Sequence, residues 1–594
     1  MTFKKFRHSP FLPIYSTIFL YVFYYLISAW QFDVEIVSSS IPLDGFVQLI
    51  FAYILYALSR KAWIFVMLHA LIMGILYLGN PIKIAFFGGP LMPDDIFALR
   101  SLLLILNGWK FFALALPLVI LGSLLIFNFT LRRFHNYISG VFAGLLTITT
   151  IYQPNLIVEP IDTYIGTMPW NQRANYVWQG ATIHTLVETA RYFLLADSAP
   201  DENEVKKAAQ QLLNQQTEAN TFEDFQPRNV HIVLLESFWD ANNLAKVKFN
   251  KNPLSADFRK IWKNANNSTA LVPVFAGMTA NSEFEILCGF PVTKNTVKFE
   301  RQLLNEVPCL PHLLAEKGYK TVVSHPNVPV FWNRVNAYHR VGFQTYWSEK
   351  DFDLDDINRE FLGDSSLYRQ VLSKISDTLN SQQPILDYIV TYFGHWDYPL
   401  NENRPALITS NSKVDEVTAY ANTTFYKSQE FVDFIKNLQA KDPNGIIVAF
   451  GDHLPFLGEN FAGYVESNFL TKERGDFSDA MFKSYVSTPL LIIDGKKGAV
   501  EVGSLPLYQV PKLILNLLHF NQKTIMDFTA QPENTVIRPL TGLHFDQSKD
   551  GKLSVCKAPP YSPECEQSLK WLKAVETVSN DLFIGKQTTR SFVN

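Results

Sequence analysis

The stretch FLPIYSTIFLYVFYYLISAW, residues 11–30, carries no charged side chain. An apolar run of about 20 residues is long enough to cross the hydrocarbon core of a bilayer as a helix. Four further segments of the first 155 residues have the same character: 45–59, 62–79, 111–129 and 137–153. We therefore expect residues 1–155 to form a transmembrane domain of about five helices. A cleaved signal peptide is the alternative for the first segment, but that segment is too long and too aromatic for one.

Basic residues near these segments predict the orientation of the bundle, because Lys and Arg collect on the cytoplasmic side of a membrane. There are three clusters: Lys4, Lys5 and Arg7; Arg60 and Lys61; Arg132 and Arg133. All three fall on one side only if there are five spans, and an odd number of spans places the two ends of the chain on opposite sides. The N-terminus is then cytoplasmic, and the large C-terminal part lies outside the membrane.

All four cysteines lie in the part that is expected outside the membrane. Cys556 and Cys565 bracket a short proline-rich loop and are predicted to form a disulfide, as an oxidising compartment allows. Cys288 and Cys309 form either a second disulfide or buried free thiols. This cysteine usage favours a periplasm, and hence the inner membrane of a bacterial cell.

Beyond residue 155 the chain has several parts. Residues 156–225 are predicted as a helical linker, residues 226–530 as an extracytoplasmic catalytic domain, and residues 531–594 as a C-terminal extension with the expected disulfide. The formal net charge of −3 gives no indication of nucleic-acid binding.

Runs that are apolar on both faces recur in the catalytic part and read as strands. They are 229–235, 321–324, 386–393, 445–450 and 489–494, and helical stretches lie between them. Strands buried on both faces are what a parallel sheet covered by helices needs. The predicted fold class is therefore a five-helix transmembrane bundle followed by an α/β domain with a mostly parallel sheet.

An acid or a histidine follows each of the first four runs. Glu236 follows the first, His325 the second, His395 the third, and Asp452 with His453 the fourth. In α/β sheets, ligands bind at the carboxyl ends of the strands. One such residue alone is more often a solvated loop residue, but four in succession favour a common site. Carboxylates and imidazoles suit one divalent metal ion, with Mn²⁺ expected and Zn²⁺ or Mg²⁺ as alternatives.

Thr279 lies in VPVFAGMTANSEFEILCGFP, residues 272–291, after a small-residue turn and at the expected start of a helix. Two interpretations of its hydroxyl are open. It caps the helix, or it is a metal-activated nucleophile that also gains the field of the helix N-terminus for a phosphoryl group. The capping-box spacing Ser282-x-x-Glu285 would use Ser282 and leave Thr279 free.

The ordered motifs of this part resemble those of the lipoteichoic acid synthase and phosphoglycerol transferase family, in the alkaline phosphatase/sulfatase superfamily. The motifs are LLES (234–237), FAGMTANSEFEIL (275–287), SHPN and FWNR (within 324–334), GHW (394–396) and GDHLP (451–455). The resemblance implies a metal held by Glu236, Thr279, Asp452 and His453, with Thr279 as the catalytic nucleophile. It also implies a glycerol phosphate pocket lined by His325, Trp332, Arg334 and His395.

The chemistry of these residues agrees with the implied roles. Arg334 suits bidentate binding of a phosphate, and His395 suits proton transfer to or from an alcohol. Trp332 could wall the glycerol or simply belong to the core. Two departures are visible: Ala-Gly-Met precedes Thr279 where many relatives have more glycine or a lysine, and the Cys/Ser-x-Pro-x-Arg signature of true sulfatases is absent.

The resemblance thus implies an enzyme that moves glycerol phosphate from the membrane phospholipid phosphatidylglycerol to an envelope glycan or polymer, through a phospho-threonine intermediate. Two alternatives stay open. A phosphoethanolamine transferase that modifies lipid A or an envelope glycan would need an acid in the place of Arg334. A non-catalytic membrane binding or regulatory protein would have no need to keep the complete set of site residues.

Overall fold

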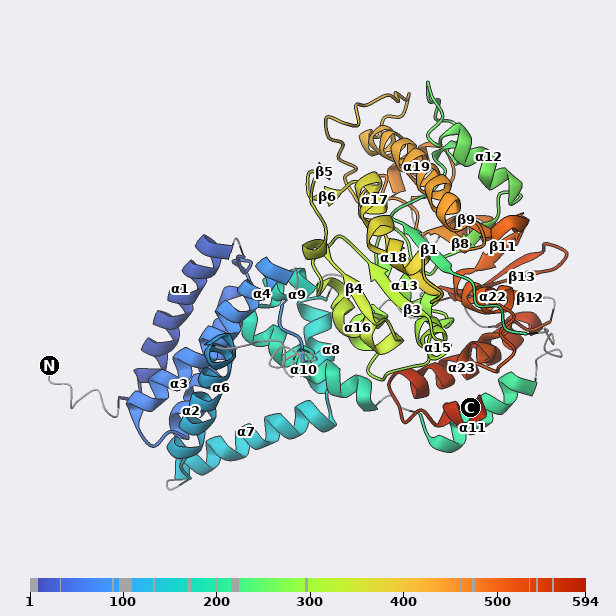
Figure 1. Ribbon diagram of the computed structural model, residues 1–594. Helices are drawn as coiled ribbons and strands as arrows, with labels where there is room; N and C mark the ends of the chain where they lie inside the picture. The colour runs from blue at the N-terminus through green and yellow to red at the C-terminus, as the bar shows by residue number, and fades with distance from the viewer. Residues whose placement is uncertain are drawn as a thin grey trace. The chain divides into compact units, whose positions relative to one another are not determined.

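The computed structural model describes residues 9–32, 34–87, 90–93, 95, 109–131, 134–167, 172–197, 200–214, 224–293, 297–458, 461–472, 476–533, 535–540, 543–557 and 560–593. The chain divides into two compact units, Met1–Ser198 and Ala199–Asn594, which Figure 1 shows in blue to teal and in green to red. The finer boundaries at residues 155, 225 and 530 remain predictions.

The first unit is helical. Its helices are α1 (Leu12–Phe32), α2 (Ile41–Ala57), α3 (Ala62–Gly74), the π-helical turn η2 (Ile75–Gly79), α4 (Asn80–Phe87), α6 (Trp109–Asn128), α7 (Phe134–Tyr152), α8 (Asn155–Tyr164), α9 (Gln172–Gln179) and α10 (Ala181–Asp197). Each of the five predicted apolar segments therefore coincides with a helix.

Two helical stretches of the described residues are long and apolar enough to cross a membrane, Leu12–Phe32 and Ala62–Ile84. A third candidate is the pair Asn136–Tyr152 and Asn155–Tyr164, which is bent by 82° at the break between them. The helix Ile41–Ala57 is apolar but shorter. Of the five expected spans, the described residues thus support two or three. The basic clusters at residues 4–7 and 132–133 lie outside the described residues.

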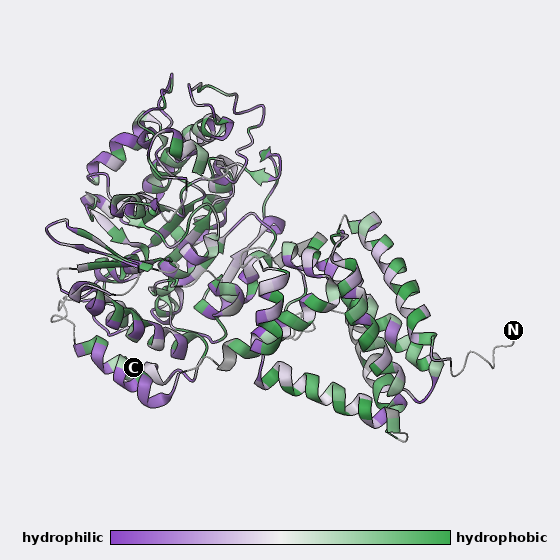
Figure 2. Cartoon of the chain, turned by 180° about the vertical axis from the view of Figure 1, so that it is seen from behind, coloured by the Kyte–Doolittle hydropathy of each residue, from purple (hydrophilic) through white to green (hydrophobic). Residues whose placement is uncertain are grey.

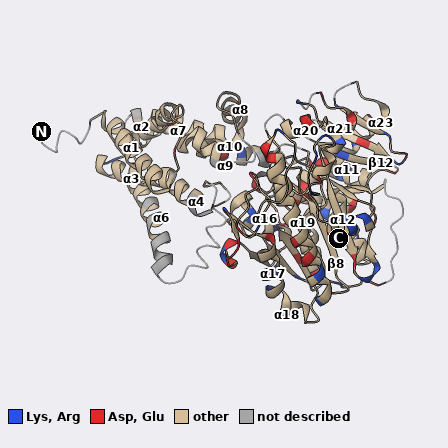
Figure 3. Cartoon of the chain, turned by 90° about the horizontal axis from the view of Figure 1, so that it is seen from above, with Lys and Arg blue, Asp and Glu red and all other residues tan. Residues whose placement is uncertain are grey.

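The surface of the first unit is apolar, as contact with lipid requires. On α1, for example, Ile18, Phe19 and Leu26 are each more than half exposed. Figure 2 shows apolar residues around the outside of these helices, and Figure 3 shows few charged residues on α1, α2 and α3. Large exposed apolar patches mark interaction or membrane surfaces, which supports the membrane expectation for this unit.

The second unit is built on a nine-stranded mixed sheet in the order β11-β2-β9-β8-β1-β7-β3-β4, with β10 paired to β9. The strands are β1 (Val230–Leu235), β2 (Thr269–Leu271), β3 (Lys320–Ser324), β4 (Thr345–Trp347), β7 (Ile385–Val390), β8 (Ile446–Gly451), β9 (Ser487–Asp494), β10 (Gly498–Ala499) and β11 (Ser504–Pro506). The neighbours of β1, which are β7 and β8, both run parallel to it.

The sheet differs from the prediction in one strand direction. β9 covers the predicted run 489–494, but it pairs antiparallel with β8, with β2 and with β10. A run that is apolar on both faces indicates burial and not direction. The sheet is therefore mixed, while its central strands β8, β1, β7 and β3 are parallel as expected.

Helices cover both faces of the sheet, and β1 shows the division. Ile232 and Leu234 belong to one buried cluster, together with residues of α13 (Thr279–Cys288). Val233 and Leu235 belong to the other, with residues of α17 (Asp364–Lys374) and α19 (Asp415–Lys441). The alternation of side chains along a strand thus produces a three-layer domain.

The C-terminal segment joins the core of this domain. It forms a three-stranded antiparallel sheet and a long helix: β12 (Thr535–Leu540), β13 (Leu543–Ser548), β14 (Leu553–Cys556) and α23 (Pro563–Phe583). Phe545 and Trp571 belong to the same buried cluster as Ile232. Two disulfides are present, Cys556–Cys565 between β14 and α23, and Cys288–Cys309, which the sequence left open.

Candidate active site

The carboxyl ends of β1 and β8 bring three residues together. Glu236 directly follows β1, and Asp452 and His453 directly follow β8, its parallel neighbour. One ligand atom from each of these three residues lies within 4.8 Å of the other two. All three side chains are buried. The strand-end argument therefore predicted a real convergence of two carboxylates and an imidazole.

Thr279 is the first residue of α13, and the turn before it has an unusual backbone. Ala276, Gly277 and Met278 have φ values of 51°, 149° and 59°. Positive φ values are costly for residues other than glycine, here Ala276 and Met278, and such strain gathers at functional sites. The turn places Thr279, which is 8% exposed, at the helix N-terminus. There its hydroxyl interacts with the Asp452 carboxyl.

Neither capping interpretation agrees with the structure. The N-cap position of α13 is Met278, which makes no side-chain cap. Ser282 donates instead to the backbone carbonyl of Asp452 at 2.7 Å, and Glu285 accepts from Arg538. Ser282 thus connects the helix that carries Thr279 to the loop that carries Asp452, and the Thr279 hydroxyl is left to the site.

The hydrogen bonds around the cluster leave free lone pairs on the atoms that face its centre. Nδ1 of His453 is bonded to the Leu454 carbonyl at 2.9 Å, so it carries the proton and Nε2 presents a lone pair. Nε2 lies 3.2 Å from Asp452 Oδ2 and 3.8 Å from Glu236 Oε1. Oδ2 of Asp452 has no hydrogen-bond partner among the described residues. Facing lone pairs of this kind fit a divalent cation.

Without a bound cation, the pKa values of the Glu236 and Asp452 carboxyls are shifted in opposite directions. Burial acts to raise the pKa of Glu236, but His395, His453, the hydrogen bond from Ser237 and the charge of Lys427 together outweigh it, and the net pKa is lowered. Burial, followed by the charge of Glu236, raises the pKa of Asp452. Two neighbouring buried carboxyls hold one negative charge more readily than two, and a cation would favour ionisation of both.

We expect Glu236→Gln to lower the affinity for divalent metal at least about 10-fold, because a neutral amide replaces a charged ligand. The measurement is the metal content of the purified full chain after dialysis against limiting Mn²⁺. Asp442→Asn is the matched control, since Asp442 bonds His231 near the amino ends of β1 and β8. Full metal retention by Glu236→Gln would remove Glu236 from the site.

The other predicted site residues occupy different environments. His325 follows β3, is buried, and bonds the Val390 carbonyl through Nδ1 at 3.0 Å. His395 is exposed, bonds the Trp396 carbonyl through Nδ1, and packs against Phe361 with ring centroids 5.2 Å apart. His395 therefore keeps an accessible Nε2, as a residue that exchanges protons with a substrate needs.

Arg334 and Trp332 are both buried. Trp332 is 8% exposed and belongs to the main core cluster, so its packing role is established by the structure. Arg334 donates from Nε and Nη2 to one oxygen of Glu283, at 3.0 and 2.7 Å, and from Nη1 to the Phe331 carbonyl. An arginine has five N–H donors. These three bonds leave one donor on each Nη nitrogen.

Two buried residues behind the site were not predicted. Glu283 lies four positions after Thr279 on α13, fully buried, and also accepts from Tyr338. Lys427 on α19 donates to Asp364 and to Thr391 Oγ1 at 2.7 and 2.8 Å, and the same Oγ1 accepts from the backbone of Glu236. The helical spacing from Thr279 could have indicated Glu283, but no sequence signal marks Lys427.

The burial of His325 predicts a pH effect on stability. Burial, then the charge of Arg334, lowers the pKa of this imidazole well below its ordinary value near 6.5. Below about pH 6.5 the unfolded chain therefore binds a proton that the native protein does not, and the free energy of unfolding falls as the pH falls. The contribution approaches about 1.4 kcal/mol per pH unit.

We expect His325→Gln to be less sensitive to acid than the unmodified chain. The measurement is the free energy of unfolding of both proteins between pH 5.0 and 7.5. The difference between the two curves isolates His325 from the other titrating groups. Parallel curves over this range would show that the imidazole is protonated in the native state.

Comparison with known proteins connects this site to a family. Residues 228–503 match the family described as Sulfatase. A Rhizobium meliloti protein named for cyclic beta-1,2-glucan modification is 29% identical over 280 residues, which are 46% of this chain and 42% of that protein. The lipoteichoic acid synthase of Staphylococcus aureus is 26% identical over 343 residues, which are 55% of this chain and 51% of the synthase.

The chain therefore matches about half the length of these curated relatives. Among solved structures, the lipoteichoic acid synthase LtaP of Listeria monocytogenes aligns with a TM-score of 0.49 and 19% identity, over 65% of this chain and 98% of that one. The family match and the sequence similarity to the synthase confirm the resemblance that the ordered motifs predicted.

Proposed function

We propose that this chain, whose residues 228–503 match the sulfatase family, is a membrane-anchored transferase that moves glycerol phosphate from phosphatidylglycerol to a hydroxyl of an envelope glycan or polymer. One observation carries the proposal: the strained turn at 276–278 presents the Thr279 hydroxyl at a helix N-terminus, where it interacts with Asp452 of the cluster Glu236, Asp452 and His453. The names of the two relatives, a lipoteichoic acid synthase and a glucan-modifying protein, support an envelope acceptor.

Glu236, Asp452, His453 and the Thr279 hydroxyl would hold one divalent cation, with Mn²⁺ expected first. When bound, such an ion lowers the pKa of a ligating hydroxyl and neutralises charge that develops on phosphoryl oxygens. The bare lone pairs of His453 Nε2 and Asp452 Oδ2 support this ligand set.

The proposed reaction is a double displacement. In the first step the deprotonated Oγ of Thr279 attacks the phosphorus of phosphatidylglycerol. The Oγ–P bond forms, the bond from phosphorus to the diacylglycerol oxygen breaks, and protonated His395 gives its proton to that oxygen. The amide field at the start of α13 favours the phosphoryl group there.

In the second step a hydroxyl of the acceptor attacks the same phosphorus. The new O–P bond forms, the bond from phosphorus to Thr279 Oγ breaks, and His395 takes the proton of the acceptor hydroxyl. Both Thr279 and His395 are then back in their starting states. The exposure of His395 supports a residue that serves two alcohols in turn.

Arg334 would bind the phosphate with the donor that remains on each Nη nitrogen. Glu283 positions that guanidinium from the helix that also carries Thr279, and His325 and Trp332 would line the glycerol side of the pocket. Both headgroups carry the phosphate, but a guanidinium in the pocket would repel the ammonium of phosphoethanolamine, which supports glycerol phosphate.

We further propose that the first unit anchors the enzyme in the bacterial inner membrane, with a cytoplasmic N-terminus and a periplasmic catalytic domain. The apolar surface of the helical unit supports the anchor. The two disulfides support an oxidising compartment for the second unit. The anchor keeps the site near a donor that is confined to two dimensions, which raises its effective concentration.

The test is incubation of the purified full chain and Mn²⁺ with vesicles that contain labelled phosphatidylglycerol. We expect diacylglycerol release and, by mass spectrometry, a glycerophosphate adduct on Thr279 in the 272–291 peptide. Vesicles with labelled phosphatidylethanolamine are the comparison. If phosphatidylethanolamine alone gave release and an adduct, it would replace phosphatidylglycerol as the donor. If neither lipid gave either product, the result would contradict a transferase.

A further inference from the structure

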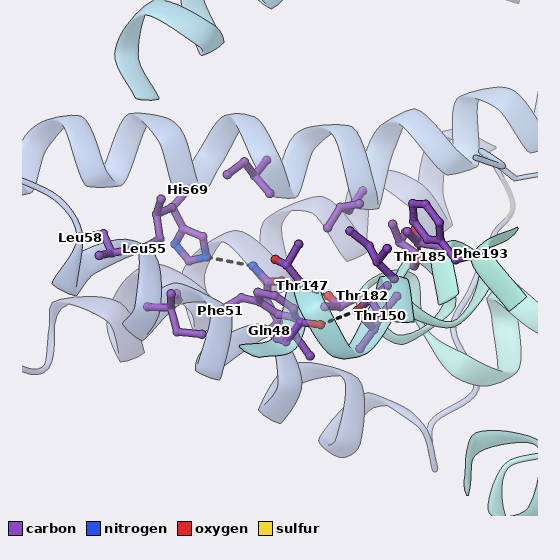
Figure 4. A pocket seen from close by; sticks show the side chains of 18 residues that line it. Gln48, Phe51, Leu55, Leu58, His69, Thr147, Thr150, Thr182, Thr185 and Phe193 are labelled. Carbon is purple, nitrogen blue, oxygen red and sulfur yellow. Dashed lines mark hydrogen bonds between the residues drawn. The ribbon is translucent and has the colours of Figure 1, made fainter. Parts of the chain in front are cut away.

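A cavity of about 500 Å³ lies inside the first unit, between α2, α3, α7 and α10 (Figure 4). Ligand pockets of this size are ordinarily lined by apolar side chains with a few placed polar groups. Here most of the wall is aliphatic or aromatic, for example Phe51 and Leu55 of α2 and Phe193 of α10. No Lys, Arg, Asp or Glu is among the described residues that line it.

The polar groups of the wall form a hydrogen-bonded row. Gln48 Nε2 lies 3.1 Å from His69 Nε2, and Thr182 Oγ1 donates to Gln48 Oε1 at 3.0 Å, as the dashed lines of Figure 4 show. Since the amide nitrogen donates, His69 Nε2 accepts, and its Nδ1 therefore donates to Ser16 at 2.8 Å. The row is satisfied within the protein and fixes one side of the cavity.

Four threonines of the wall have already used their only hydrogen. Thr147, Thr150, Thr185 and Thr189 each donate to the carbonyl four residues earlier in their own helix, at 2.7 to 2.9 Å. A hydroxyl that has donated still has lone pairs to accept with. The threonines therefore offer the cavity hydrogen-bond acceptors.

This inventory excludes some ligands and favours others. A phosphate in the cavity would face acceptor oxygens and no cation, and an unpaired buried charge is strongly unfavourable. An apolar molecule with a free hydroxyl would fill the aliphatic wall and donate to a threonine oxygen. Among the glycerolipids, a long apolar molecule with one hydroxyl and no charge is a diacylglycerol.

We infer that this cavity binds diacylglycerol by its free hydroxyl and adjoining chain. The choice of diacylglycerol as the neutral glycerolipid rests on the proposed function, which releases that lipid. The cavity then binds the product diacylglycerol and excludes the donor phosphatidylglycerol by charge. The two lipids have the same acyl chains and differ in the phosphate headgroup.

The test uses the full chain with Thr279→Ala, which cannot turn the donor over, in phosphatidylcholine vesicles. One sample contains diacylglycerol with a photoreactive group on a chain, and another contains phosphatidylglycerol with the same group. After irradiation, peptides of α7 and α10 are analysed for label by mass spectrometry. We expect diacylglycerol labelling that excess unlabelled diacylglycerol suppresses at least about 10-fold and excess phosphatidylglycerol does not.

A matched pair of variants on α7 locates the label. Thr150→Phe adds a ring at a lining residue that is 7% exposed, fills the cavity, and is expected to reduce the suppressible labelling about 10-fold. Ile148→Phe adds the same ring two residues earlier, at a residue that is 55% exposed, and is expected to change nothing. Equal labelling in the two variants, or equal competition by phosphatidylglycerol, would overturn the inference.

Failure of the inference and failure of the proposed function give different results. Release of diacylglycerol from labelled phosphatidylglycerol by the unmodified chain tests the reaction independently of the cavity. Specific labelling without release would support a neutral-lipid site and contradict phosphatidylglycerol as the donor. Release without specific labelling would support the transferase and contradict the diacylglycerol site in the cavity.

Discussion

Replacement of Thr279 by alanine should reduce diacylglycerol release from phosphatidylglycerol at least about 10³-fold, because the alanine side chain has no oxygen to attack the phosphorus. Bound metal should largely remain, since Glu236, Asp452 and His453 still converge. The measurements are the initial rate of release and the metal content of the same preparation. Loss of release with metal retained is the result that separates a nucleophile from a structural ligand.

Thr279→Ser is the informative companion, because it keeps the hydroxyl. We expect it to retain release within about 10-fold of the unmodified chain and to form the same adduct on the 272–291 peptide. Thr269→Ala is the matched control for loss of a hydroxyl, since Thr269 on β2 bonds Ser504 on β11, away from the site. Undiminished release by Thr279→Ala would exclude the double displacement and favour a non-catalytic protein.

The fold could be predicted where burial and sequence pattern coincide. The central strands β1, β3, β7 and β8 follow from runs that are apolar on both faces, and their parallel pairing follows from the helices between them. The edge strands β4 and β11, and β2 beside β11, have three residues each, too few for a pattern. The reversed direction of β9 depends on the path of its connection, which no local pattern records.

The site was predictable for a similar reason. Parallel strands end at the same edge of a sheet, so Glu236 and Asp452 could be brought together from residue types and strand ends alone. The residues that hold the site in place were not predictable, because their partners are distant in sequence. Arg334 and Glu283 are 51 residues apart, and Lys427 and Asp364 are 63 apart.

Arg538→Met should lower the free energy of unfolding of the second unit by about 3–5 kcal/mol, the cost of leaving one partner of a buried ion pair alone. Arg538 on β12 donates to both oxygens of Glu285, at 2.7 and 2.6 Å, and both side chains are fully buried. Glu285 is on α13, so this pair connects the C-terminal sheet to the helix that begins with Thr279. Arg369→Met is the control, because its pair with Asp355 is exposed and worth about 0–1 kcal/mol.

The effect of Arg538→Met should also depend on pH and on Glu285. Burial already raises the pKa of Glu285 against the pull of Arg538. Without the arginine, the native state would bind a proton there that the unfolded chain does not, so stability should rise as the pH falls from 7.5 to 5.5. The double variant Arg538→Met, Glu285→Met should recover most of the loss, since no charge is then buried. Denaturant unfolding of the full chain measures all four proteins, and a double variant as unstable as the single one would show that the pair stabilises α13 through packing.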